Sequence, residues 1–299
     1  MRGMRSRSRF TTVLAVMALV GAGCGGGDEP AKEPEKAAPK AEAKQFPAGT
    51  PMAELQEKSE IAIGVKFDVP PFGFKNPQTN QLEGFDVEIG NEIAKDLGIK
   101  PRFIEAISDN RIPFLKEGTA DLILSTMTIN AERDKEIDFS DPYYVAKGRI
   151  LVPKDSDIKA LADLSGKAVC TALGSTYEET LRKEAPRAER KLVDSYSECL
   201  ELLQNGAVDA VSTDDVILTG MIIQDDSLHL VGEELTTEPY GAGIREGETE
   251  LQEYVNGVLD EMKSDGRWER IYQKWVGRFT GQRQQPPTMT LQEALEPAS

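Results

Sequence analysis

Apolar and polar positions along the chain alternate between two periods, one typical of strands and one typical of helices. Between Phe85 and Leu97, apolar residues recur every three or four positions, which predicts an amphipathic helix that Gly98 ends. Short apolar runs bounded by turn residues, such as Ile61–Val65, predict buried strands. Strands separated by helices indicate an α/β fold with largely parallel sheets.

The same patterns place the remaining elements in order. The further expected strands are 122–125, 149–152, 167–171, 207–212, 228–231 and 241–244, and the further expected helices are 111–116, 176–183, 197–204, 214–223, 248–263 and 267–275. One sequence motif occurs twice, in residues 115–126 and 203–214. In each copy a helix ends in Gly, and the strand that follows has Asp near its start and Ser-Thr at its end. Because ligands of open α/β sheets bind beyond the carboxyl ends of strands, we expect two such ends to face each other across a cleft.

The segment Leu122–Arg133 carries the clearest chemical signal. Its short apolar strand ends in the hydroxyl side chains of Ser125, Thr126 and Thr128, and Arg133 follows in a charged turn. Buried hydroxyls need hydrogen-bond partners, and a guanidinium can hold a carboxylate through two parallel N–H donors. We therefore expect a pocket floor for a small ligand that carries a carboxylate. The alternative is that Arg133 is an ordinary cation of a helical turn.

The first residues have the pattern of an export signal. Four arginines precede the apolar run 13–20, whose 8 residues are too few to span a bilayer. Residues 21–24 (Gly-Ala-Gly-Cys) then resemble the cleavage site of bacterial lipoproteins, which predicts a signal peptide over residues 1–23 and a lipid on Cys24. The alternative is an ordinary secretory signal with an incidental cysteine, and both interpretations export the protein.

Both ends of the exported chain have the composition of unstructured segments. Residues 24–54 are rich in Gly, Pro, Ala, Lys and Glu, so we expect a lipid-anchored flexible linker there, and we expect residues 281–299 to form a disordered tail. Removing residues 1–23 takes away four of the 35 basic residues and no acidic ones, so 31 basic and 51 acidic residues leave a net charge of −20. This charge argues against nucleic acid as a partner and requires a local cationic pocket for any anionic ligand.

Cysteine and histidine usage limits the chemistry further. Cys170 and Cys199 remain once Cys24 is assigned to the lipid, and an isolated pair in an oxidising setting favours a disulfide, with two separate buried thiols as the alternative. The single histidine, His229, cannot build a metal site without a Cys/His cluster, so we expect no metal and no cofactor.

Several ordered motifs together resemble the bacterial extracellular solute-binding proteins of family 3, which deliver polar amino acids to ABC importers. These motifs are PPFGF at 70–74, GFDVEIGNEIAKDLG at 84–98, TMTINAERDKEIDFSDPYY at 126–144, GST at 174–176, GAVDAVSTD at 206–214 and EMKSDGRWERIYQKW at 261–275. The resemblance covers roughly residues 58–278 and is strongest for the glutamate/aspartate-binding type. The surroundings of Cys170 and Cys199 resemble those in the glutamate-binding lipoproteins of high-GC Gram-positive bacteria.

The resemblance implies a periplasmic-binding-protein-like type II fold, in which two α/β lobes close on a ligand in the cleft between them. Residues 55–147 and 242–280 would form the first lobe, and residues 148–241 would form the second.

Matched position by position, the resemblance assigns one end of an amino-acid ligand. Arg133 would hold the α-carboxylate, with Thr126 and Thr128 around the same end of the ligand. Thr176, at the start of a helix, would offer a backbone N–H to that carboxylate. Asp214 would accept the α-ammonium, and an exchange of roles between Asp214 and Asp215 is the alternative.

The other end of the ligand would meet Lys66 and Arg111. Two cations at the side-chain end imply a carboxylate there, because a buried carboxylate without such partners is costly. The alternatives are a surface lysine at position 66 and an arginine at position 111 that caps a helix or pairs with surface acids.

The resemblance therefore implies a binding protein and not an enzyme. L-Glutamate is the expected ligand, with aspartate, glutamine and asparagine as alternatives. We expect a monomer outside the cell membrane, anchored by its lipid, that docks to an ABC permease. The competing functions are a cyclohexadienyl-dehydratase-like enzyme on the same fold and a ligand-sensing ectodomain.

Overall fold

A computed structural model gives the structure of residues 44–296. The predicted signal peptide, the predicted lipid on Cys24 and the first part of the predicted linker lie outside these residues. The strands are β1 Glu60–Val65, β2 Asp68–Val69, β3 Gly73–Lys75, β4 Leu82–Glu83, β5 Lys100–Glu105, β6 Leu122–Ile123, β7 Ile137–Phe139, β8 Tyr144–Pro153, β9 Ala168–Ala172, β10 Glu189–Val193, β11 Ala210–Asp214, β12 Leu228–Val231, β13 Thr237–Tyr240 and β14 Gly243–Arg245.

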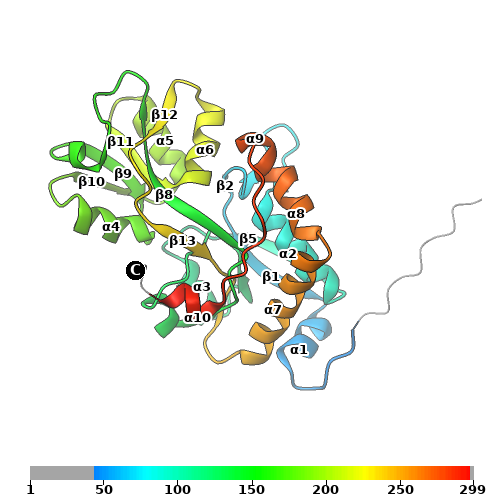
Figure 1. Cartoon of the computed structure of the whole chain (residues 1–299). Helices are drawn as coiled ribbons and strands as arrows, with labels where there is room; N and C mark the ends of the chain where they lie inside the picture. The colour runs from blue at the N-terminus through cyan, green and yellow to red at the C-terminus, as the bar shows by residue number, and fades with distance from the viewer. Residues whose placement is uncertain (1–43, 297–299) are drawn as a thin grey trace, which may run out of the picture. The chain divides into compact units, whose positions relative to one another are not determined.

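The helices alternate with these strands over most of the chain. They are α1 Pro51–Lys58, α2 Phe85–Asp96, α3 Arg111–Glu117, α4 Thr176–Glu184, α5 Tyr196–Gln204, α6 Asp215–Gln224, α7 Thr249–Ser264, α8 Arg267–Tyr272, α9 Arg278–Thr280 and α10 Leu291–Leu295, with the short helical turns η1 Arg133–Lys135, η2 Leu161–Leu164 and η3 Gln273–Gly277. The predicted α/β class is confirmed, and Figure 1 shows how strands and helices follow one another along the chain.

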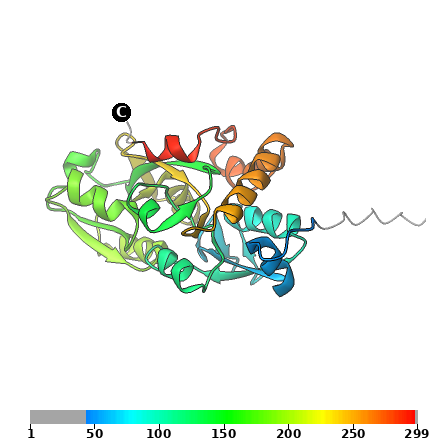
Figure 2. The same ribbon diagram turned by 90° about the horizontal axis from the view of Figure 1, so that it is seen from below.

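Two sheets with the same plan form the centres of two lobes. The first sheet has the order β5-β1-β6-β14-β7, and the second has the order β10-β9-β11-β8-β12. In each sheet three parallel strands are followed by an antiparallel one. Helices cover both sheets, and α2 and α7 lie side by side on the first lobe (Figure 2). Parallel strands joined by helices place the carboxyl ends of β6 and β11 at matching edges of the two sheets.

The motif that occurs twice in the sequence has the same structural role in both lobes. The carboxylate of Asp121 accepts a hydrogen bond from the backbone N–H of Ala62 at 2.8 Å, and the carboxylate of Asp209 accepts one from Ala168 N–H, also at 2.8 Å. Each aspartate thus satisfies a backbone donor on the neighbouring parallel strand, β1 in the first sheet and β9 in the second. The repeat fixes the register of the strand that ends at the cleft.

The chain passes between the lobes twice, and the two passages pair with each other. The first residues of β8 pair antiparallel with β13, from Tyr144 with Tyr240 to Lys147 with Thr237. The later residues of β8 pair with β11 and β12 in the second sheet. After β13 the chain enters the first sheet again through β14. The exact boundaries between the lobes, expected at residues 147/148 and 241/242, stay a prediction.

The predicted disulfide is confirmed. Cys170 on β9 and Cys199 on α5 are bonded, with a Cα–Cα distance of 5.5 Å, and both residues are fully buried in the core. Closing a loop with a sequence separation of 29 residues restricts the unfolded chain, which contributes about 3–4 kcal/mol in the chain-entropy account. The bond holds α5, which carries Tyr196 at its start, against the second sheet.

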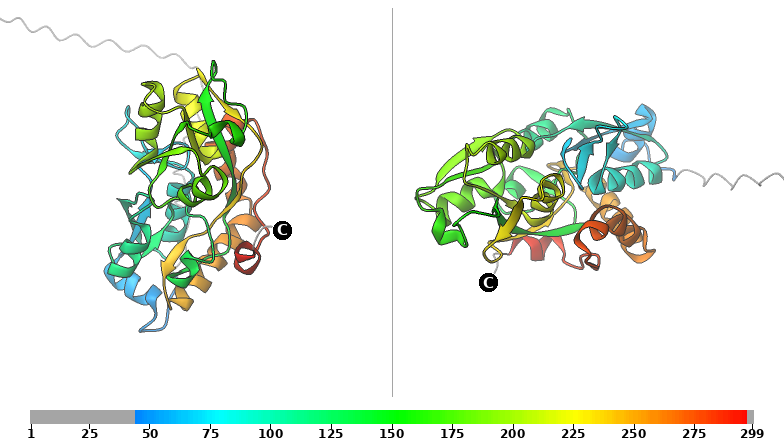
Figure 3. Two further views of the ribbon diagram at one scale, coloured as in Figure 1. Left: turned by 90° about the vertical axis from the view of Figure 1, so that its left-hand side faces the viewer. Right: turned by 90° about the horizontal axis from the view of Figure 1, so that it is seen from above.

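The predicted disordered segments differ from the structure at both ends. The expected linker, 24–54, overlaps α1, whose first turn is capped by Thr50. The expected tail, 281–299, contains α10, which begins with a capping box between Thr290 and Glu293. The C-terminal segment ends beside the first lobe, as Figure 3 shows in red.

Two kinds of contact hold α10. The backbone N–H of Leu291 donates to the Asp141 carboxylate at 2.6 Å. Leu291, Ala294 and Leu295 also pack against an apolar cluster that includes Ile129. A short helix gains most of its stability from such packing, which explains why this polar segment folds.

Removing α10 should lower the stability of the protein. A chain stopped after Gly281 loses the partly buried apolar side chains of α10, so we expect its free energy of unfolding to fall by about 1–3 kcal/mol. Urea unfolding followed by circular dichroism measures this change. A chain stopped after Glu296 is the control and should match the full-length protein; equal stability of both truncated chains would contradict a structural role for α10.

Candidate functional site

A small polar cleft lies where the carboxyl ends of β6 and β11 approach the start of α4. It is lined by Ser108, Arg111, Thr126, Thr128, Arg133, Ser175, Thr176, Tyr177, Tyr196 and Asp214. Six of the seven residues predicted to bind ligand are in this set. The seventh, Lys66, is fully buried and donates to the Ser108 hydroxyl at 2.8 Å, so it lies directly behind the lining.

Thr126 has an unusual backbone conformation that Asp86 supports. Its φ of +45° lies in the left-handed region, which is costly for a residue with a branched side chain. The buried Asp86 carboxylate accepts the backbone N–H of Thr126 at 2.9 Å and the Tyr143 hydroxyl at 2.9 Å. Burial raises the pKa of Asp86 to about 7, against these two hydrogen bonds. Asp86 belongs to the GFDVE motif, but its role becomes visible only in the folded chain.

Arg111 organises the end of β6 from beneath. Its Nε donates to Ser108 O at 3.1 Å, and its Nη1 donates to Ser125 O at 2.9 Å and Thr126 O at 3.1 Å. The side chain is buried, and burial and the nearby Arg133 together lower its pKa to about 9. Most of its donors therefore serve the backbone, which differs from a purely ligand-directed role. The hydroxyl of Ser125 also turns away from the cleft, to Ala106 O at 2.8 Å.

Arg133 spans the cleft from the first lobe to the second. Its Nη1 donates to Thr128 O at 2.7 Å, and its Nη2 donates to Gly174 O at 3.0 Å. Arg111 Nη2 reaches the same Gly174 carbonyl at 3.4 Å. One neutral carbonyl of the second lobe thus faces two guanidinium groups, and a carboxylate in its place would be a stronger acceptor.

Lys66 is the third cation of the cleft. Its ammonium lies 5.7 Å from the centre of the Tyr196 ring, in addition to its bond to Ser108. Burial lowers the pKa of Lys66 to about 7, and repulsion by Arg111 and Arg133 lowers it further against the attraction of Asp68 and Asp214. Charge on Lys66 is therefore disfavoured until an anion approaches.

Asp214 and Asp215 have different surroundings. Asp214 is buried, lines the cleft and accepts the Tyr177 hydroxyl at 2.9 Å. Burial raises its pKa well above the usual range, and Glu238 adds to this effect. Asp215 Oδ1 instead accepts the backbone N–H groups of Lys147 and Val216 at 3.1 and 2.9 Å. Asp214 is thus the aspartate of the cleft, and Asp215 supports the start of α6.

Sequence reasoning missed several polar residues around the cleft. They are Asp86, Ser108, Ser175, Tyr177, Tyr196 and Glu238. Ser175, Tyr177 and Tyr196 stand at or next to the first residues of α4 and α5, and helix starts after parallel strands were the available signal for them. Glu238 lies on β13, which the apolar pattern did not predict as a strand.

The lobes lie closed on each other. The cavity among the lining residues is about 10 Å³, about enough for one water molecule. Ser197 N–H on α5 also donates at 3.1 Å to Asp68, the first residue of the first lobe's β2. A solute larger than water can therefore enter only when the two lobes move apart.

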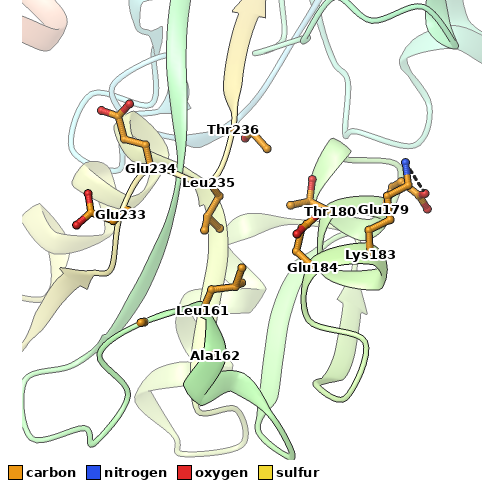
Figure 4. Close-up of a pocket in the computed structure, with 11 residues that line it drawn as sticks. Leu161, Ala162, Glu179, Thr180, Lys183, Glu184, Glu233, Glu234, Leu235 and Thr236 are labelled. Atoms are coloured by element: carbon orange, nitrogen blue, oxygen red, sulfur yellow. Dashed lines mark ion pairs between the residues drawn. The ribbon is translucent and has the colours of Figure 1, made fainter. Parts of the chain in front are cut away.

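Two larger cavities outside this cleft lie among residues 44–296. One, of about 550 Å³, lies on the second lobe, and its charged lining residues are Glu179, Glu184, Glu233, Glu234 and Lys183, which is paired with Glu179 (Figure 4). Its acidic walls do not suit an anionic solute. The other, of about 560 Å³, lies between α10 and β13 and shares Thr128, Thr176 and Glu238 with the surroundings of the cleft. The cleft remains the place where opposite charges from both lobes converge.

The fold and the cleft define a two-lobed protein that binds a small solute between its lobes. The sequence profile of the bacterial extracellular solute-binding proteins, family 3, matches residues 61–278, so the chain belongs to this family. Within residues 44–296, every helix is too short or too polar to span a bilayer.

Particular relatives bind different amino acids. The chain is 41% identical over 229 residues to the ABC transporter glutamine-binding protein GlnH of Bacillus subtilis, which covers 75% of this chain and 84% of the relative. It is 34% identical over 236 residues to the glutamate-binding protein GluB of Corynebacterium efficiens, covering 74% and 80%. A solved structure of an ancestral arginine-binding protein bound to glutamine is 42% identical, with a TM-score of 0.70, and covers 73% of this chain and 98% of that one.

Gly220 on α6 should control closure of the lobes. A Cβ atom at this position would lie 1.8 Å from the carbonyl oxygen of Pro70, which belongs to the first lobe. We expect Gly220→Ala to hold the lobes apart while its helix gains about 0.5–1 kcal/mol from the better helix former. Small-angle X-ray scattering should show a larger radius of gyration than that of the wild type.

Gly257→Ala is the matched control for this substitution. Gly257 also lies inside a helix, α7, and a Cβ there would meet nothing within 4 Å. Its radius of gyration should equal that of the wild type. An unchanged radius for Gly220→Ala would contradict the close approach of α6 to Pro70.

Proposed function

We propose that this protein captures an acidic amino acid, first of all L-glutamate, and delivers it to an ABC permease at the outer face of the cell membrane. The observation that carries the proposal is the convergence of Lys66, Arg111 and Arg133, all from the first lobe, on a cleft closed by Asp214 and the start of α4. A ligand with two carboxylates and one ammonium has charges that complement this arrangement. Relatives named for glutamine and glutamate support the amino-acid class.

The α-amino-acid end of the ligand would lie between Arg133 and Asp214. The guanidinium of Arg133 points at Gly174 O beside the start of α4, where backbone N–H groups and the helix dipole favour an anion. The ligand α-carboxylate would replace this carbonyl as the acceptor. The α-ammonium would pair with Asp214 and restore the charge that burial disfavours. Thr126, Thr128 and Thr176 would surround this end.

The side-chain carboxylate would meet Lys66, with Arg111 in support. The Nε and Nη1 groups of Arg111 donate to three backbone carbonyls, so replacing Arg111 would disturb the cleft for every ligand. Lys66 makes fewer hydrogen bonds within the protein, because its ammonium donates to the Ser108 hydroxyl alone among the described side chains. Lys66 is therefore the residue we assign to the choice between glutamate and glutamine.

Delivery requires that the binding protein stays near its permease. The lipid predicted on Cys24 would anchor the chain, and the linker would let the lobes reach the permease. We propose that the protein acts as a lipid-anchored monomer. Opening and closing around β8 and β13 would load and release the ligand.

Calorimetry with the twenty amino acids tests the proposed function. We expect L-glutamate to bind most tightly, and Arg133→Ala to weaken binding of every amino acid by at least about a hundredfold, because a charge-assisted bidentate contact is lost. Tighter binding of glutamine than glutamate would move the assignment to a neutral polar ligand. Turnover of prephenate or arogenate by the purified protein would favour the dehydratase-like alternative.

Binding of glutamate should depend on pH through Lys66. Because its pKa in the free protein is lowered to about 7, Lys66 is largely neutral at higher pH, and a ligand carboxylate favours the protonated form. Lys66 therefore takes up a proton on glutamate binding, whereas Asp214, whose pKa is raised, releases one when it pairs with the ammonium of any amino acid. The ratio of glutamate affinity to glutamine affinity, in which the Asp214 contribution cancels, should fall by up to about tenfold per unit as pH rises above about 7. Calorimetry of both ligands in buffers with different ionisation enthalpies measures the difference in proton uptake.

Lys66→Met and glutamine provide the controls for the pH effect. The substitution should weaken glutamate binding and remove the pH dependence that Lys66 contributes, whereas Asp86, whose pKa is also about 7, remains in both proteins. Glutamine, which would pair with Asp214 in the same way but lacks the second carboxylate, is the reference: with Lys66→Met the ratio of the two affinities should no longer depend on pH. An equally steep pH dependence of this ratio for Lys66→Met would assign the proton to another group.

A further inference from the structure

Glu238 joins groups from both lobes at a single atom. Its Oε2 accepts the Thr128 hydroxyl at 2.6 Å and the Thr176 hydroxyl at 2.9 Å. The side chain is buried, with 3% of its surface exposed. Both bonds are charge-assisted O–H···O contacts, which are among the stronger hydrogen bonds in proteins.

The two threonines differ in what holds them. Thr128 forms an isolated β-bridge with Tyr240, so it is fixed to β13, the same strand that carries Glu238. Thr176 is the first residue of α4 and belongs to the second lobe. Glu238 and Thr128 therefore form one unit at the crossing strands, and Thr176 is the partner that arrives or leaves when the lobes move.

These bonds also decide what the threonines offer to a ligand. A hydroxyl has one hydrogen atom, and in both residues this atom points to Glu238. Towards the cleft the two oxygens present lone pairs, which accept from an ammonium. Neither hydroxyl can then donate to the ligand α-carboxylate, for which Arg133 and backbone N–H groups at the start of α4 are the nearby donors.

We propose that Glu238 is a positioning residue that couples the two lobes in the closed state and orients Thr128 and Thr176 for the ligand. The proposal rests on the proposed function, in which a solute is held in this cleft. For the lobes to part, the bond between Glu238 and Thr176 must break while the bond to Thr128 persists. Glu238 should therefore slow the escape of the ligand more than it speeds its capture.

Stopped-flow kinetics with L-glutamate tests this coupling in the full-length protein. Glu238→Gln keeps the shape of the side chain but removes its charge, so we expect the dissociation rate constant to rise by about tenfold to a hundredfold with a small change in association. Glu233→Gln is the matched control, because Glu233 is an exposed glutamate near β13. It should behave as the wild type. An unchanged dissociation rate in Glu238→Gln would overturn the proposal.

A double-mutant cycle separates positioning from direct contact with the ligand. Thr176→Val removes the second-lobe partner and should by itself raise the dissociation rate by a similar factor. Adding Glu238→Gln to Thr176→Val should then change the rate little, because the coupling is already lost. Fully additive effects would mean that Glu238 contacts the ligand itself, which would overturn the positioning role. An unchanged rate in Thr176→Val would do the same, even if Glu238→Gln failed to fold.

Scattering of the ligand-free proteins keeps this test independent of the proposed ligand. Glu238→Gln and Thr176→Val should both have a larger radius of gyration than the wild type and Glu233→Gln. If no amino acid bound to the wild type, the proposed function would fail while this comparison still tested the coupling. Equal radii for all four proteins would overturn it.

Discussion

The placement of three cations in one closed cleft is the constraint on which the site depends. Moving charges out of water is costly, and here the cost falls on the buried Lys66 and Arg111 and on the half-buried Arg133. The protein offsets it largely with neutral acceptors, the backbone carbonyls at the end of β6 and at Gly174. Neutral acceptors satisfy the donors without cancelling the charge, so the cleft keeps its attraction for an anion in an otherwise acidic protein.

The unusual backbone at Thr126 is part of the same arrangement. Its carbonyl accepts from Arg111 and its N–H donates to Asp86, so one residue connects a buried cation with a buried acid. Asp86 is in turn hydrogen-bonded to Tyr143, just before β8. The floor of the cleft is thereby tied to the strand that leads to the second lobe.

Local signals in the sequence were sufficient for most of the fold and for much of the site. Local patterns show where β6 and β11 end. The hydroxyls and the arginine after β6, and the aspartate at the end of β11, could therefore be predicted as site residues. Short strands such as β7 and β13 were not predicted because a few residues carry too little periodicity to identify them. The longer strands β5 and β10 were also missed, because they lie at the edges of their sheets and are rich in exposed polar residues. The capping box at Thr290 was present in the sequence, but the polar composition around it outweighed that signal.

The missed site residues share a different cause. Glu238 and Thr128 are 110 positions apart, so their bond exists only through the pairing of distant segments. The Nη1 group of Arg111 likewise donates to carbonyls that are 14 and 15 residues away in the sequence. Residue type and spacing predict which charges gather at a strand end, whereas the partner of each hydrogen atom depends on tertiary structure.

The cavity between α10 and β13 makes the C-terminal segment a suitable place for a reporter of lobe movement. The lining of the cavity includes Leu295, which packs on the first lobe, the exposed Glu296 that follows it, and Leu235 and Thr236, next to the crossing strand β13. A pair of fluorescent dyes, one at Glu296 and one on an exposed position of the second lobe such as Glu234, would convert lobe movement into an optical signal. The dyes would stand outside the cleft, so the same pair could report on any solute that the protein closes around.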